Sequence, residues 1–191
     1  MKILFALLCV LAIADARADP RADVQRAFEN VLAAGGFRGY AQGHLFGPGL
    51  PALTGEVDVL FPDRIHVRAE QMEFIALPDR AWVSALGLWT PTDRALLPVT
   101  AFDVTAMRKA IASIRDVHEE GTAKAHQCGT HVYRFRSSGQ LPGGGGDGDL
   151  RVWVCEGTNR PARFEATDTQ STDKLTFDFD WSQRPDVHAP R

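Results

Sequence analysis

Apolar residues near the start of the chain recur at the spacing of one helical face. Asp19 is a good N-cap, Pro20 suits the first helical position, and Gly35–Gly36 ends the pattern. The apolar stripe follows the i, i+3, i+4, i+7, i+8 rule and consists of Val24, Ala27, Phe28, Val31 and Leu32. The pattern predicts an amphipathic helix that needs a surface to cover.

From Phe37 to Trp89 the hydrophobic period changes to two, which is typical of half-buried strands. Glu56 to Phe61 alternates, and Ile65 and Val67 alternate with Arg64, His66 and Arg68. Pro62–Asp63 separates these two runs. Two further short runs, Met72 to Leu77 and Ala81 to Leu86, are separated by Pro78–Asp79. Short strands broken by Pro and Asp indicate an antiparallel meander.

The helical period returns once, and strands follow it to the end. Asp103 to Val117 predicts a second helix with the stripe Val104, Met107, Ile111, Ile114 and Val117. Four strands are expected after it, at Thr130–Arg136, Leu150–Cys155, Ala162–Thr167 and Lys174–Trp181. The order predicts an α+β fold, in which one large curved antiparallel sheet carries two helices on one face.

The extreme N-terminus has the pattern of a secretory signal peptide. Lys2 precedes the apolar run Ile3–Ala14, and Ala16-Arg17-Ala18 supplies a cleavage site. A buried N-terminal helix is the alternative. We expect residues 1–18 to be removed, residues 19–181 to form one periplasmic domain, and the polar tail 182–191 to be disordered. No other stretch is long and apolar enough for a membrane helix.

Composition narrows the class of protein. The chain has 191 residues, of which 45% are hydrophobic and 24% charged, so a disordered protein is excluded. The net charge is −3, with 21 basic and 24 acidic residues. This balance gives no basic field for phosphates, and a nucleic-acid partner is not expected.

Two cysteines, Cys128 and Cys155, remain after Cys9 leaves with the signal peptide. In an oxidising compartment they predict one disulfide. Pairing Cys128 opposite Cys155 separates the two faces of the hairpin, with Tyr133, Phe135, Leu150, Val152 and Val154 on the apolar side. A metal site of His126, Cys128 and His131 is the alternative, and we predict no metal.

No catalytic or nucleotide-binding signature occurs in the chain. It contains no G-x-S-x-G, H-E-x-x-H or Walker motif. His118-Glu119-Glu120 is interpreted as a solvated helix end rather than a proton shuttle, and Gly143–Gly146 as a flexible hairpin tip rather than a phosphate cradle. We therefore expect no enzyme activity and no cofactor.

Two segments resemble periplasmic proteins of the LolA-like lipoprotein-carrier superfamily. They are Leu60–Val67, followed by Met72–Ile75 and Trp82–Val83, and Cys128–Phe135, paired with Leu150–Cys155 and followed by Arg160–Arg163. The resemblance implies an incomplete barrel of about eleven antiparallel strands, with helices over its concave side and acyl chains between the two layers.

The inward-facing side chains could line a ligand cavity or fill an ordinary core. The candidate ligand-binding residues are Phe61, Ile65, Ile75, Val83, Tyr133, Phe135, Val152, Phe177 and Phe179. The first hypothesis is a monomeric, non-enzymatic periplasmic carrier for a lipid, a lipoprotein acyl chain or another amphiphile. The alternative is an envelope protein-interaction or stress-sensor module. Arg64, His66 and Arg68 either contact a headgroup or acidic partner or form a solvated outer face.

Overall fold

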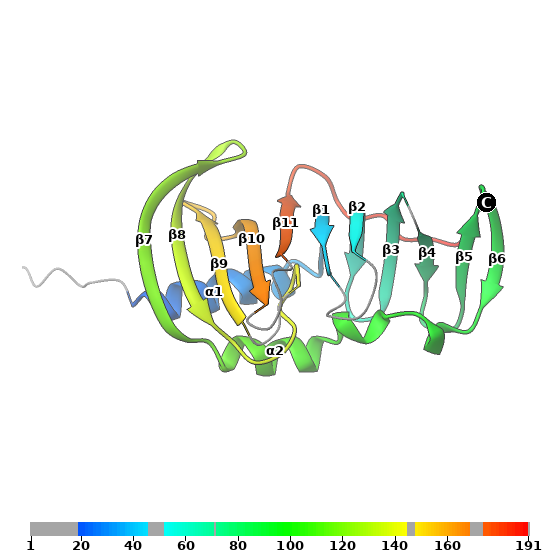
Figure 1. Ribbon diagram of the computed structural model, residues 1–191, viewed down its shortest axis with the longest axis horizontal. Coiled ribbons are helices and arrows are strands. Elements are labelled where there is room, and N and C mark those ends of the chain that lie inside the picture. Colours follow the sequence, from blue (N-terminus) through cyan, green and yellow to red (C-terminus); the bar gives the residue numbers. More distant parts are fainter. Residues whose placement is uncertain (1–18, 46–51, 71, 145–147, 169–173, 191) are drawn as a thin grey trace, which may run out of the picture.

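One antiparallel sheet runs the length of the molecule, with β6 and β7 at its two ends (Figure 1). The computed structural model describes residues 19–45, 52–70, 72–144, 148–168 and 174–190, so the predicted signal peptide lies outside the described residues. In this part of the chain the sheet has 11 strands in the order β6-β5-β4-β3-β2-β1-β11-β10-β9-β8-β7. The open sheet and its two α-helices confirm the predicted α+β class.

The elements follow one another in the order helix, six strands, helix, five strands, with two short 3-10 turns before the second helix. Their bounds are α1 (Pro20–Ala33), β1 (Gly36–Gly43), β2 (Leu53–Leu60), β3 (Arg64–Ala69), β4 (Glu73–Ala76), β5 (Ala81–Ala85), β6 (Leu88–Thr92), η1 (Arg94–Leu96), η2 (Val99–Phe102), α2 (Val104–Ala112), β7 (Arg115–Ala125), β8 (Cys128–Arg136), β9 (Gly148–Cys155), β10 (Pro161–Asp168) and β11 (Lys174–Asp180).

Helix α1 confirms the first prediction. The Asp19 carboxylate accepts a hydrogen bond from the Arg21 backbone N–H at 3.0 Å, and Pro20 opens the helix. All five residues of the predicted stripe are buried. The helix contacts β7, β9, β10 and β1 and so covers the concave face of that half of the sheet (Figure 1).

The second helix is shorter than predicted. Helix α2 begins after the cap Asp103 and ends at Ala112, because the backbone N–H of Ser113 closes onto the carbonyls of Lys109 and Ala110. The prediction was wrong from Ser113 onward, because the helix ends at Ala112 and the chain enters β7 at Arg115. Most side chains of β7 are exposed, so no alternating burial pattern marks the strand in the sequence.

The hairpin of β8 and β9 has the predicted faces but not the predicted register. Cys155 lies opposite Thr130, and Tyr133 lies opposite Val152, which is two residues away from a Cys128–Cys155 pairing. A slip of two residues keeps every side chain on its face, so the apolar side was still predicted correctly. The disulfide itself is present and runs diagonally across the end of the hairpin, with 5.6 Å between the Cα atoms.

The loop after β8 turns back onto the core. Leu141 is fully buried, and the side chain of Gln140 donates to the Leu45 carbonyl at 3.1 Å. Gly144 has a φ of 121°, and a Cβ there would collide with the Leu175 side chain. The prediction of a flexible tip is therefore wrong for Gly143 and Gly144; Gly145 and Gly146 lie outside the described residues.

The C-terminal segment lies against the sheet as far as residue 190. It has no helix or strand, but Gln183 accepts a hydrogen bond from Arg38 at 2.7 Å and Val187 is only 4% exposed. In Figure 1 the red segment runs from β11 toward β5. Val187 is buried but does not belong to the continuous core. The disorder of the tail stays an expectation, and the structure adds these two contacts to it.

Candidate functional site

Most of the predicted ligand-binding residues lie inside the core on the concave face. Each is at most 5% exposed, and the set consists of Ile65, Tyr133, Phe135, Val152, Phe177 and Phe179. Phe61 is half-buried against the same cluster. A ligand-binding role for these residues stays a prediction.

Aromatic rings fill the space between α1 and the sheet. The ring centroid of Phe28 lies 6.0 Å from that of Phe135 and 5.9 Å from that of Phe164. Farther along the sheet, Phe37 lies 5.5 Å from both Phe177 and Phe179. Centroid separations of this size are those of rings in direct contact, so the filled-core alternative describes this part of the molecule.

Tyr133 carries the phenol group of this interior. Its side chain is buried under α1, and burial raises the pKa of its phenol to about 12, with smaller contributions from the carboxylates of Asp23 and Glu119. Deprotonation of this phenol would place a charge in the buried interior, and burial opposes it.

Ile75 lies on the other face of the sheet, so its prediction as an interior residue was wrong. It pairs with His66 on β3 and with Trp82 on β5, whereas Phe74 pairs with Val67 and Val83. Cross-strand partners share a face. Phe74, Ile75 and Ala76 are all apolar, so the sequence contains no alternation that could assign their faces.

An apolar groove lies on the concave side of β2–β5, in the half of the sheet beyond the aromatic core. Its volume is about 290 Å³. Four apolar side chains and two polar ones at the strand ends form most of its lining, namely Leu53, Ala69, Met72, Val83, Glu73 and Ser84. Among the nine predicted ligand-binding residues, Val83 is the one in this lining. The other groove residues were missed because they lie at strand ends, where the alternating pattern stops.

The opposite face of β1–β4 carries a network of charged side chains around Asp58. Asp58 is fully buried, and its Oδ2 accepts from Arg68 at 2.7 Å, while Nε of Arg38 lies 3.4 Å from Oδ1 without hydrogen-bond geometry. Both arginines also contact Glu56. The hydrogen bond from Arg68 holds the pKa of Glu56 below its ordinary value. His66 and Arg68 are therefore structural partners here; Arg64 is exposed at the start of β3.

His66 gives this network a pH dependence. Arg68 donates to Nδ1 of His66 at 2.8 Å, so Nδ1 accepts and the neutral ring carries its proton on Nε2, which donates to Glu73 at 3.2 Å. Burial lowers the pKa of His66, and the hydrogen bond with Glu73 opposes that effect. The folded state thus binds a proton less readily than the unfolded state.

We expect the free energy of unfolding to fall as pH drops below about 6.5, the pKa of an unfolded histidine. Urea unfolding of the parent and of His66→Gln at about pH 7.5 and about pH 5.5 measures the effect. The parent should lose more stability than the variant between the two pH values. Equal losses in both proteins would contradict the assignment of this pH dependence to His66.

A larger cavity of about 500 Å³ lies between the tip of the β7–β8 hairpin and strands β1 and β11. His126 at the tip reaches Asp178 on β11 at 3.2 Å, and Asp178 also accepts from Arg163 at 2.7 Å. Hydrogen bonds from Ser182 lower the pKa of Asp180 in the same wall. Most of these charges are already paired, and the rest of the lining is largely apolar or aromatic, including Tyr40, Trp181 and the predicted ligand-binding residue Phe179.

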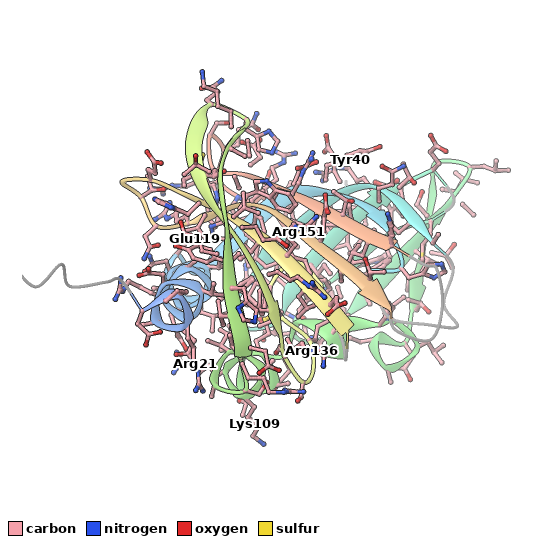
Figure 2. All side chains as sticks on the ribbon, turned by 60° about the vertical axis from the view of Figure 1, so that its left-hand side comes forward. Arg21, Tyr40, Lys109, Glu119, Arg136 and Arg151 are labelled. Atoms are coloured by element: carbon pink, nitrogen blue, oxygen red, sulfur yellow. A yellow bond between two sulfur atoms is a disulfide. The ribbon has the colours of Figure 1, made fainter. Side chains whose placement is uncertain are left out.

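The remaining candidates have ordinary structural partners. His131 contacts Glu119 at 2.8 Å, and Arg151 donates to Glu120 at 3.2 Å, so the predicted helix end is in fact a charged strand. Figure 2 shows Glu119, Arg136 and Arg151 on the curled end of the sheet, apart from Arg21 and Lys109 on the helices. Within the described ranges no cluster of three or more His, Cys, Asp or Glu could hold a metal. No described helix is long and apolar enough to cross a membrane.

Solved structures share this architecture. The lipoprotein LppX of Mycobacterium tuberculosis superposes with a TM-score of 0.63 at 13% identity, over 88% of this chain and 98% of that one. LprF of Mycobacterium bovis gives 0.62 at 10% identity, over 90% and 96%. The LolA superfamily protein NE2245 of Nitrosomonas europaea matches more loosely, at 0.31 and 10% identity over 84% and 91%.

No family model and no curated protein matches the sequence. At these low identities the superpositions on LppX and LprF show the fold alone, an open antiparallel sheet with helices on one face, as predicted.

Proposed function

We propose that this protein is a non-enzymatic binding protein of the bacterial envelope that holds an acyl chain of a lipid, a lipoprotein or another amphiphile. The apolar groove of β2–β5 carries the proposal. It is lined mainly by aliphatic side chains, and it lies where the aromatic core does not fill the concave face.

The groove suits one chain better than a whole lipid. Its volume of about 290 Å³ is at the lower end of the range for small-molecule pockets. Removing an acyl chain from water is favourable by about 0.8 kcal/mol per CH₂, so binding needs few hydrogen bonds. Glu73 and Ser84 at the rim are the polar groups that a headgroup would meet.

The experiment is native mass spectrometry of protein purified from a bacterial envelope, with extraction and identification of the bound molecules. We expect an acyl-bearing molecule in the parent. Ala69→Phe should lower its occupancy more than tenfold, because the new ring occupies the groove. Val83→Asp should do the same by placing a charge there.

Ala85→Phe is the matched control, because Ala85 is exposed at the end of β5 and does not line the groove. It should keep the ligand. Folded parent protein that carries no acyl-bearing molecule contradicts the proposal and favours the envelope protein-interaction alternative. Equal occupancy in all three variants contradicts the position of the site.

A further inference from the structure

The turn between β5 and β6 places a leucine where the backbone disfavours it. Leu86 and Gly87 form a two-residue connection, because Ala85 pairs directly with Leu88. Their φ angles are 52° and 79°, both left-handed. Such turns favour Asn-Gly or Gly-Gly, and a bulky residue with positive φ is an outlier. Leu86 therefore does not occupy this position for the sake of the turn.

The same leucine has no packing role. Its relative exposure is 104%, and that of Leu88 is 74%. Leu88 pairs with Ala85 and so shares the concave face with Val83. Neither side chain stabilises the core, and both expose apolar surface to water at the free end of the sheet (Figure 1).

The surrounding hairpin contains no charge. Residues Ala81 to Thr92 hold no Asp, Glu, Lys or Arg, although 24% of the whole chain is charged. Exposed edge hairpins are usually protected by charged residues, and here Pro91 and the short length of β6 serve that purpose instead. Trp89 pairs with Ser84, and its ring centroid lies 6.2 Å from that of His66, so it packs on the opposite face of the sheet from Leu88. Exposed leucines on a turn without charges are typical of segments that enter the boundary between headgroups and acyl chains.

The apolar groove is next to this turn. Ser84, two residues before Leu86, lines the groove together with Val83 and with Met72, which precedes β4. Strands β2 and β4 begin, and strands β3 and β5 end, at this end of the sheet. The groove and the exposed leucines therefore belong to one edge of the molecule.

A bilayer fits this tip better than a protein does. A stable protein interface buries about 800 Å² on each partner and needs a complementary surface. Two leucines on a narrow turn offer much less, whereas a lipid surface accepts a protruding apolar side chain without a preformed pocket. The absence of charge on the hairpin indicates a surface of zwitterionic lipids rather than attraction to anionic ones.

We infer that the Leu86–Leu88 tip inserts into a zwitterionic lipid surface and brings the mouth of the groove to it, so that an acyl chain passes between bilayer and protein. The inference rests on the proposed function for its purpose, but the insertion itself is a separate physical claim. Insertion into lipid gives the exposed leucines a role, because neither the turn geometry nor core packing accounts for them.

The test is co-flotation of the purified protein with phosphatidylcholine vesicles. We expect binding that is unchanged between about 50 mM and about 500 mM salt, because apolar insertion is not screened. Leu86→Asn should lower the partition coefficient about tenfold, since one buried leucine side chain is lost. Its Tm should be equal to or above that of the parent, because Asn-Gly suits this turn.

Leu96→Asn is the matched control. Leu96 is 78% exposed on η1, which follows the opposite end of β6. Its variant should bind vesicles like the parent. The inference is overturned if the parent does not float with vesicles, if high salt releases it, or if Leu96→Asn loses as much binding as Leu86→Asn.

Native mass spectrometry of the same proteins distinguishes the two claims. If the parent carries an acyl-bearing molecule but does not bind vesicles, the proposed function stands and the insertion is overturned. A parent that binds vesicles through Leu86 but carries no such molecule retains the insertion and overturns the proposed function.

Discussion

Replacing Phe28 with alanine is expected to lower the free energy of unfolding by about 3–5 kcal/mol. The side chain is fully buried on α1 and lies between Phe135 of β8 and Phe164 of β10. Its loss leaves a cavity where the helix meets the sheet, and neither ring partner can fill that space from a strand. The Tm should fall by roughly 6–20 °C for a chain of this size.

Urea unfolding followed by circular dichroism measures the change. Phe28→Leu is the control, because it keeps most of the volume and should cost less than half as much. A loss below about 1 kcal/mol for Phe28→Ala would mean that α1 does not pack on the sheet as described.

The second large effect is expected from Cys128→Ser. The disulfide joins residues 27 positions apart, and a cross-link of this span stabilises a fold by about 3 kcal/mol in the chain-entropy view. It ties the base of the β7–β8 tip to the end of β9, beside the cavity that His126 closes. The variant should therefore melt below the oxidised parent.

Melting curves with and without reductant isolate the bond from the substitution. Parent and variant should coincide when both are reduced, and Cys155→Ser should reproduce Cys128→Ser. Equal melting of the oxidised parent and Cys128→Ser would refute the contribution of the bridge.

Helices and strands were predicted well from the sequence where one face of the element is buried and the other is exposed to solvent. The stripe of α1 was correct in every residue, and β11 alternates as predicted, with Leu175, Phe177 and Phe179 buried. The prediction of strand β7 failed for the opposite reason. Its side chains are mostly exposed on both faces, so its position depends on backbone pairing with β8, which no periodicity records.

The candidate site was harder to predict than the fold. Alternation shows that Phe177 or Val152 points inward, but it does not show which inward residues pack on a helix and which border open space. That division depends on where α1 ends and how Leu141 folds back, and both are long-range contacts. Leu53 and Met72 of the groove lie at strand ends, so their shared lining could not be inferred from their own segments.

The pairing of β1 with β11 has a consequence for how the chain is made. Arg38 lies opposite Asp180, so the centre of the sheet joins residues from nearly opposite ends of the polypeptide. Contacts of such long sequence separation form slowly. A growing chain that has not reached Lys174 leaves β1 and β10 as unpaired edges, and the native sheet closes only after synthesis is almost finished.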